Sequence, residues 1–202
     1  ALHIARLPPE QPLPLRLCSA GATLLGAEGG AVTLTATPSA PYVLATTDSV
    51  AERIESLQEV LGVGPRHEAH RSSRPASLDV GDAPDAPSSL AQEVREAVGE
   101  VRVHSYPMVV SGSVLGVFSV HLAAGATLSR ADDEAMVVAA IIGGALLRDL
   151  HEASSSLPSG WPARAKIHPA TCTVIALPTV PPDHPPILPP PHPYPTESPK
   201  SH

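Results

Sequence analysis

Residues 101–122, VRVHSYPMVVSGSVLGVFSVHL, restrict the fold of this chain more than any other segment does. Two runs rich in Val, with Tyr in the first and Phe in the second, flank the small residues 111–113. Runs of β-branched and aromatic residues around such a turn are typical of a β-hairpin. Alternate residues of the first strand are polar or large, and both alternating sets of the second strand contain apolar residues. We therefore predict a sheet with two unlike faces, both covered by other elements.

The overall composition is compatible with a folded domain. With 202 residues, of which 43% are hydrophobic, the chain can form one or two domains with a core of ordinary size. Its net charge of -7 argues against a protein that coats nucleic acid without sequence preference, because such binding rests on Lys and Arg. The chain begins with Ala1 rather than Met, so the sequence leaves its native start open.

Cysteine usage and hydropathy indicate a cytoplasmic protein. Cys18 and Cys172 are far apart and lack the spacing of zinc ligands, so we expect free thiols rather than a disulfide framework or a zinc site. No window reaches the ~18 to 20 continuous apolar residues of a membrane span. No charged and then apolar start resembles a signal peptide.

Apolar periodicity and turn residues predict the other elements, which we place around the hairpin. The stripe at 50–61 predicts an amphipathic helix whose charged face is solvated. The segment 130–150 predicts a helix that is apolar on most sides, and Gly143-Gly144 within it would permit close approach of a second copy in a homodimer. Further predicted elements are a loose arm at 1–14, helices at 15–25, 67–72 and 90–98, a hairpin at 31–46 and a strand at 76–80. The fold class is thus α+β, an antiparallel sheet flanked by helices.

The order of these elements and two motifs resemble a GAF domain, a sensor fold of bacteria. The motifs are PM-x3-G-x3-G at 107–116 and LGVGPRHEAHRSSRPASLDV at 61–80, the latter similar to a segment of actinobacterial GAF regulators. The resemblance covers about 15–150. It implies a sensor domain that binds a small ligand between the central sheet and the elements covering one face.

A second resemblance concerns residues 161–176, WPARAKIHPATCTVIA, which are similar to the first helix of an ANTAR domain. That family consists of RNA-binding modules of transcription antiterminators. Pro169 lies inside the expected helix, Cys172 stands where the family has Gly, and the repeated prolines after Leu177 are incompatible with the two remaining helices. The segment 161–202 is therefore predicted to be a degenerate ANTAR-like module, a short helix with a Pro-rich and largely disordered tail, joined to the GAF-like domain by a linker at 151–160.

Candidate ligand-binding residues lie on the hairpin, at positions that the GAF resemblance places against the ligand. They are Arg102, His104, Tyr106, Met108 and His121. The alternative is that His104 and His121 are partly exposed strand residues and that Met108 belongs to the core. No feature selects a particular ligand or cofactor.

Candidate RNA-binding residues are Trp161, which could stack on a base, and Arg164 and Lys166, which could contact phosphates. A solvated basic helix face is the alternative. His67 and His70 have the spacing of a metal pair but no third ligand, and we expect no metal site. No nucleophile with a base, phosphate loop or carboxylate pair indicates an enzyme.

Two functions remain open at this stage. In the first, the chain is a cytoplasmic, signal-responsive regulator in which a GAF sensor controls an ANTAR-type RNA-binding output in transcription antitermination. In the second, it is a GAF ligand-binding or protein-interaction module whose RNA-binding end no longer functions.

Overall fold

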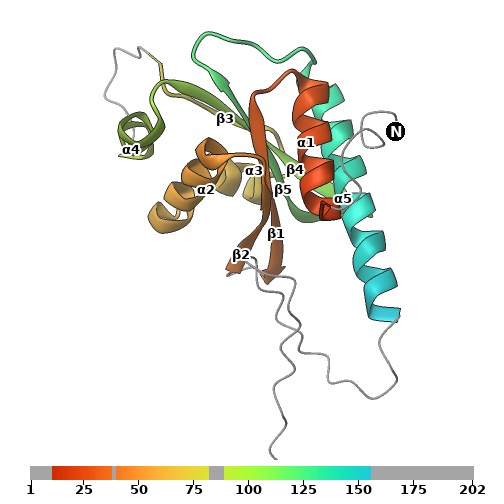
Figure 1. The fold of residues 1–202 in the computed structure, drawn as a ribbon. Coiled ribbons are helices and arrows are strands. Elements are labelled where there is room, and N and C mark those ends of the chain that lie inside the picture. The colour runs from red at the N-terminus through yellow and green to blue at the C-terminus, as the bar shows by residue number, and fades with distance from the viewer. Residues whose placement is uncertain (1–10, 38–39, 82–88, 156–202) are drawn as a thin grey trace, which may run out of the picture.

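The computed structural model describes residues 11–37, 40–81 and 89–155, which form one layered α+β domain (Figure 1). The strands are β1 (Gly29–Thr37), β2 (Ala40–Thr46), β3 (Ala76–Asp79), β4 (Val101–Val110) and β5 (Ser113–Ala123). The helices are α1 (Leu13–Leu25), α2 (Ser49–Leu61), α3 (Pro65–Ser72), α4 (Ser89–Val98) and α5 (Asp132–Ser155).

The five strands form one antiparallel sheet in the order β2-β1-β5-β4-β3. Helices α1 and α5 cover one face, while α2 and α3 cover the other, with α4 packed against α2 (Figure 1). The predicted fold class is confirmed, and the predicted hairpin is β4 and β5, with the turn at Ser111 and Gly112 in left-handed backbone conformations.

The face under α1 and α5 holds the larger apolar core, which includes Tyr106, Met108 and Phe118. Two helical glycines permit this packing. A Cβ at Gly21 of α1 would lie 2.8 Å from the ring of Phe118, and one at Gly143 of α5 would lie 3.0 Å from the Cβ of Met108. The close approach that Gly143 allows is therefore used against the sheet of its own chain.

Helix α2 shows why the local sequence fixes the layer on the opposite face. The Asp48 side chain accepts a hydrogen bond from the Ala51 amide at 2.8 Å, which caps the first turn, and Gly62 ends the helix with φ 66°. Ile54 and Leu57 point into a second apolar cluster with residues of β3, α4 and β4. The predicted charged face is not wholly solvated, because Glu55 and Gln58 are buried.

The ends of the domain differ from the prediction by a few residues. Helix α1 begins at Leu13, so the last residues of the expected arm at 1–14 are helical, with Pro14 in the first turn, where no amide hydrogen is needed. Helix α5 continues to Ser155, so the start of the expected linker at 151–160 is helical too. The predicted ANTAR-like segment at 161–202 lies outside the described residues. Within the described part, no helix is long and apolar enough to span a membrane.

Candidate functional site

The buried polar side chains of the domain gather on one face of the sheet. Strand pairing places Ser105 opposite Ser119 and Thr33 opposite Val117, all on the side covered by α2 and α3. Among the described residues, the buried polar or charged ones are Thr33, Glu55, Gln58, Arg66, Ser105, Ser119 and His121. Because a buried polar group costs free energy unless it is hydrogen-bonded, such a concentration requires an explanation.

An ion pair between two helices lies at the centre of this cluster. Arg66 Nη1 of α3 is 3.3 Å from Glu55 Oε2 of α2, and both side chains are 2% exposed. Gln58 connects the same helices: its Oε1 accepts the Arg66 backbone amide at 2.9 Å, and its Nε2 donates to Glu55 at 3.3 Å. Thr33 donates to the same carboxylate at 3.4 Å. The contacts of the Glu55 carboxylate with Arg66, Gln58 and Thr33, at 3.3, 3.3 and 3.4 Å, are longer than the roughly 2.7–2.9 Å of a strong charge-assisted hydrogen bond, so Glu55 is held loosely.

The hydrogen-bonding capacity of Arg66 is largely unused. Its Nε and Nη2 atoms are buried and have no hydrogen-bond partner among the described residues. Burial raises the pKa of Glu55, opposed by Arg66 and by the hydroxyls of Ser119 and Thr33. The cluster thus combines a guanidinium with spare donors and a carboxylate whose charge is only partly compensated.

A second pair, between His121 of β5 and Asp48, lies on the same face closer to solvent. His121 Nε2 is 3.1 Å from Asp48 Oδ1, and the side chains are 7% and 34% exposed. Thr47 donates to Asp48 Oδ2 at 2.6 Å and accepts from the Gly30 amide at 2.8 Å. Burial would raise the pKa of Asp48, but the hydrogen bonds from Thr47, the Ala51 amide and His121 outweigh it and lower that pKa. A Cβ at Gly29 would overlap this network.

One member of each pair lines a cavity of about 10 Å³: Glu55 and His121 border it together with Ser119, whereas Arg66 and Asp48 do not. This volume is near the lower limit for one water molecule, so a larger ligand requires α2 or α3 to move. The arrangement offers hydrogen-bond donors at Arg66, an acceptor at Glu55 and a low dielectric. These properties suit recognition of a small polar molecule.

The structure does not bring all five predicted ligand-binding residues together. Arg102, His104, Tyr106 and Met108 share the face under α1 and α5, whereas His121, which pairs with Val103, lies on the face under α2 and α3. The five therefore cannot line one pocket. The prediction treated His121 as a neighbour of the other four residues. Its strand neighbours Val120 and Leu122 point to the face of those four, so His121 points to the other face.

Each of the four residues on the α1–α5 face has a structural partner. Tyr106 and Met108 are 0% exposed, and the Tyr106 hydroxyl donates to Asp132 at the start of α5 at 2.8 Å. Burial raises the pKa of Tyr106, and this hydrogen bond adds to the effect. Arg102 Nε donates to Asp79 of β3 at 3.0 Å. His104 stacks on Tyr106, and burial lowers its pKa.

The remaining candidates fall into two groups. His67 and His70 both lie on α3, and no group of three or more His, Cys, Asp or Glu side chains able to hold a metal ion occurs in the part of the chain that the structure describes. The RNA-binding candidates Trp161, Arg164 and Lys166 lie outside that part.

Sequence reasoning missed the Glu55–Arg66 pair because its members are on different helices, and although Arg66 stands in the motif at 61–80, that motif assigns it no buried partner. One signal was present: Glu55 and Gln58 directly follow Ile54 and Leu57 of the apolar stripe, so their side chains lie at the edge of the buried face.

Comparisons with known proteins identify the fold. No protein-family model and no curated protein sequence matches the chain. Among solved structures, the domain of a protein named as a two-component sensor histidine kinase from Sinorhizobium meliloti 1021 matches with a TM-score of 0.53 and 16% identity, over 72% of this chain and 96% of that one. The GAF-B domain of DevS from Mycobacterium smegmatis matches with a TM-score of 0.50 and 19% identity, over 71% and 97%.

At these identities the likeness shows the fold alone. The described domain has a GAF fold, an antiparallel sheet with helices on both faces, as the sequence resemblance predicts. The comparisons give no support to an ANTAR domain, so that part of the resemblance stays a prediction.

Proposed function

We propose that the chain is a signal-responsive regulator of the cytoplasm, and that its GAF-fold domain senses a small polar ligand through Glu55 and Arg66. The observation that carries the proposal is the ion pair itself, buried at 2% exposure, in which none of the three guanidinium nitrogens has a hydrogen-bond partner among the described residues. A buried ion pair often contributes no more stability than apolar residues of the same volume. Its presence is therefore better explained by binding than by folding.

The donor set defines the chemistry of the ligand. Arg66 offers Nε and Nη2, a geometry that suits a carboxylate, a phosphate or another planar acceptor. Glu55 accepts a donor such as an amide or an ammonium group. We infer a small molecule that carries both an acceptor group for Arg66 and a donor group for Glu55. It enters as α3 shifts away from the sheet, and its contacts replace the ion pair between Glu55 and Arg66. Binding rather than catalysis is part of the proposal.

The test uses thermal unfolding of the full chain with a panel of small carboxylates, phosphates and amides at 1 mM. A ligand present at about 100 times its Kd stabilises the folded state by about 2.7 kcal/mol. The matched protein is E55Q/R66M, which keeps the volume of the cluster and removes both charges. At least one compound should raise the Tm of the wild type and not that of the double variant. The proposed site is wrong if no compound does so, or if both proteins respond equally.

For the output, we propose RNA binding by residues 161–202, acting in transcription antitermination. Its support is the resemblance of residues 161–176 to the first ANTAR helix, together with the basic side chains of Arg164 and Lys166 and the aromatic ring of Trp161 in that segment. R164A/K166A should weaken binding of a paired-hairpin RNA, and should reduce the slope of log affinity against log salt by about 0.7–0.9 per lost phosphate contact. The control R71A/R74A removes two exposed arginines of α3 and the turn after it. If the wild type does not bind, the alternative holds: a GAF module whose RNA-binding end does not function.

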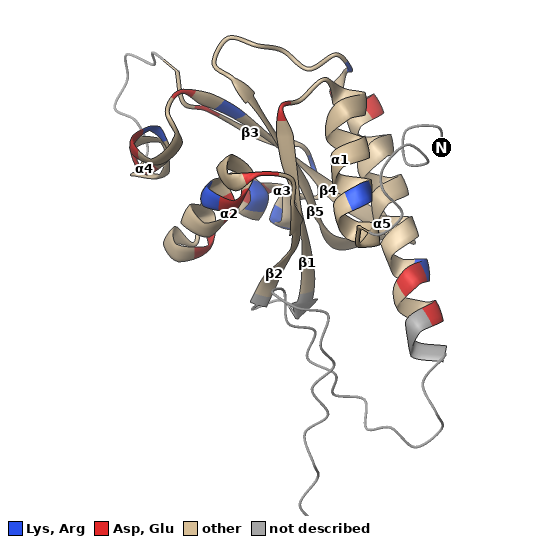
Figure 2. Ribbon diagram, viewed as in Figure 1, with Lys and Arg blue, Asp and Glu red and all other residues tan. Residues whose placement is uncertain are grey.

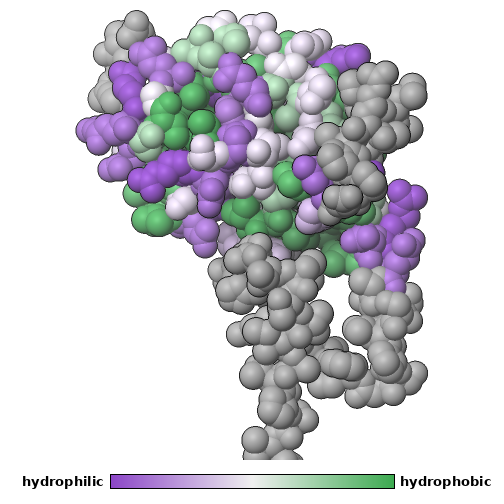
Figure 3. Space-filling view, viewed as in Figure 1, coloured by the Kyte–Doolittle hydropathy of each residue, from purple (hydrophilic) through white to green (hydrophobic). Residues whose placement is uncertain are grey.

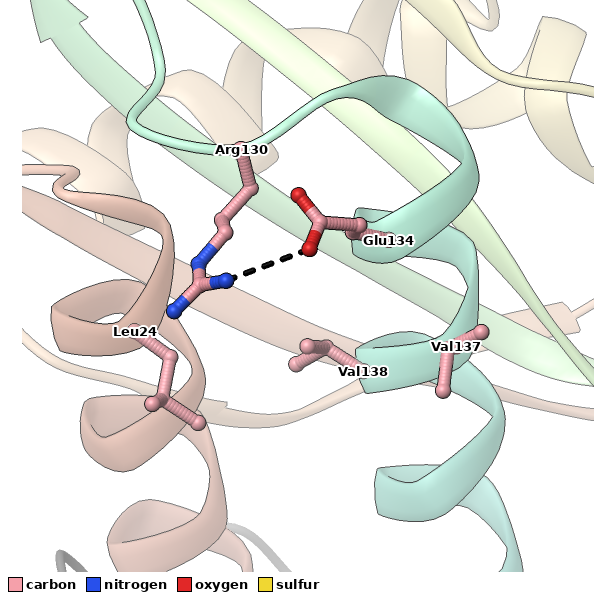
Figure 4. Close-up of a pocket in the computed structure, with 5 residues that line it drawn as sticks. All are labelled: Leu24, Arg130, Glu134, Val137 and Val138. Atoms are coloured by element: carbon pink, nitrogen blue, oxygen red, sulfur yellow. Dashed lines mark hydrogen bonds and ion pairs between the residues drawn. The ribbon is translucent and has the colours of Figure 1, made fainter.

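We also propose that the regulator is a homodimer joined through α1 and α5. Val137 and Ile141 of α5 are 59% and 62% exposed, and Leu24 of α1 is 41% exposed. Figure 4 shows Leu24 facing Val138 across a hollow of about 230 Å³, closed at one end by the ion pair between Arg130 and Glu134 at 3.1 Å. In the dimer, the exposed apolar side chains of α5 from one protomer would pack into this hollow on the other protomer.

Sedimentation equilibrium tests the dimer. V137D/I141D should be monomeric at concentrations where the wild type is dimeric. V60D/V63D, which places the same two charges on residues of α2 and the turn after it that are 80% and 48% exposed, should leave the dimer intact. A monomeric wild type at micromolar concentration contradicts the proposal.

A further inference from the structure

Strand β2 is an edge strand whose composition does not protect it from pairing. It forms one border of the sheet and, within the described residues, pairs with β1 alone. Its sequence, APYVLAT, contains no charged residue, and its only proline, Pro41, stands at the beginning. Natural edge strands are commonly short, charged or covered, because their outward backbone groups pair readily with another chain. Within the described part of the chain, residues 43–46 pair only with β1, and none of them is charged or a proline.

A groove of about 590 Å³ follows this edge and is bordered by helices from both faces of the sheet. One wall consists of Pro12 and Leu15 at the start of α1, and the other of Glu52, Ser56 and Glu59 of α2. The second wall is acidic and exposed. Figure 3 shows hydrophobic and hydrophilic surface side by side over α2 and β2, and Figure 2 marks the acidic residues of α2.

The two walls differ in chemistry, and this difference specifies an occupant. Successive side chains of a strand point to opposite faces of its sheet, so a strand added beside β2 would direct alternate residues toward the α1 wall and the α2 wall. The α1 wall is apolar at Leu15 and Pro12. The α2 wall carries two carboxylates, and Arg53 of the same helix does not line the groove.

We infer that the groove along β2 binds an extended basic peptide of a partner protein as a sixth strand. Lys or Arg at every second position pairs with Glu52 and Glu59, and the intervening apolar residues contact Leu15 and Pro12. At ~3.4 Å per residue, four consecutive residues of the peptide lie beside residues 43–46 of β2. The excess of 20 acidic over 13 basic residues in the chain favours the approach of such a peptide. This docking surface is separate from the buried cluster at Glu55 and does not depend on it.

Fluorescence anisotropy with labelled peptides tests the inference on the full chain. The probe is a seven-residue peptide that alternates Lys and Val, compared with a peptide of the same composition in two blocks. We expect the alternating peptide to bind at least tenfold more tightly than the block peptide, with an affinity that falls as salt rises. E52K/E59K should reduce this affinity at least tenfold. E93K/E96K makes the same change in net charge on α4 and should leave the affinity within twofold.

A backbone modification of the probe distinguishes strand addition from charge attraction. Only alternate residues of an added strand exchange hydrogen bonds with β2. Two probes, N-methylated at the odd or at the even positions, should therefore differ, one binding like the parent and the other at least tenfold more weakly. Equal binding by both, a block peptide as tight as the alternating one, or the same loss in E93K/E96K as in E52K/E59K would overturn the inference.

Discussion

Replacing Arg66 by Met tests whether the buried ion pair is an energetic liability that folding alone does not require. The variant keeps most of the aliphatic volume and leaves Glu55, which is 1% exposed, with Gln58, Thr33 and Ser119 as polar partners, the first two at 3.3 and 3.4 Å. Breaking a buried pair on one side costs about 3–5 kcal/mol. The loss of the under-used guanidinium offsets part of this cost, because its own desolvation penalty disappears. We expect the free energy of unfolding to fall by about 2–4 kcal/mol at pH 7.

The pH dependence of this loss follows from the pKa of Glu55. Burial holds that pKa above its ordinary value, and Arg66 lowers it, so the variant raises it further. A carboxyl with a raised folded-state pKa contributes stability at low pH and loses it as pH rises through that pKa. Protonating a carboxyl of ordinary pKa ~4.3 costs about 3.7 kcal/mol at pH 7 and about 1 kcal/mol at pH 5. Glu55 takes up a proton when keeping its buried charge would cost more than this, so these values are the upper limits of the cost of that charge at each pH. The deficit of R66M should therefore shrink toward about 1 kcal/mol at pH 5.

Urea denaturation of the wild type, R66M, E55Q and the double variant E55Q/R66M measures these values as a cycle. The double variant should lie within about 1 kcal/mol of the wild type or above it, since both charges are gone. The difference in free energy of unfolding between R66M and the wild type should shrink from pH 7 to pH 5. The difference between E55Q/R66M and the wild type should not shrink in this way. A loss below 1 kcal/mol for R66M at pH 7, or a deficit that grows as pH falls, would refute the reasoning.

Three further outcomes are expected. Gly29→Ala should lower the free energy of unfolding by more than 2 kcal/mol, because its Cβ would overlap the Asp48 carboxylate that caps α2. Gly144→Ala should raise it by up to about 1 kcal/mol through helix propensity, because its Cβ meets nothing within 4 Å. Urea denaturation measures both values. Burial lowers the pKa of His104 in the folded state, so the folded protein loses stability as pH falls below ~6.5, the pKa of an unfolded histidine. Between pH 7 and pH 5, the free energy of unfolding should therefore fall more for the wild type than for H104F. Burial raises the pKa of Cys18 to about 12, so in a Cys172→Ser chain iodoacetamide should modify Cys18 only after unfolding; native modification at pH 8 would contradict this.

The elements that sequence alone predicted well are those with local causes. The hairpin of β4 and β5 follows from two β-branched runs around a small-residue turn, and α2 follows from its apolar stripe between Asp48 and Gly62. The polar cluster could not be predicted in this way. The sequence correctly places Tyr106 and Met108 on one face of a strand, but which helices cover that face depends on how distant segments pack.

The alternation of β4 and β5 explains why the sequence indicated a two-sided sheet yet pointed to the wrong neighbours. Ser105 and Ser119 face the polar cluster, while Tyr106 and Phe118, the next residue of β4 and the preceding residue of β5, fill the apolar core under α1 and α5. A large polar side chain in a strand is therefore a weak indicator of a binding site, because Tyr106 satisfies its hydroxyl by donating to Asp132. The better indicator is a buried polar group without a hydrogen-bond partner, and Arg66, on a short helix outside the sheet, is such a group within the residues that the structure describes.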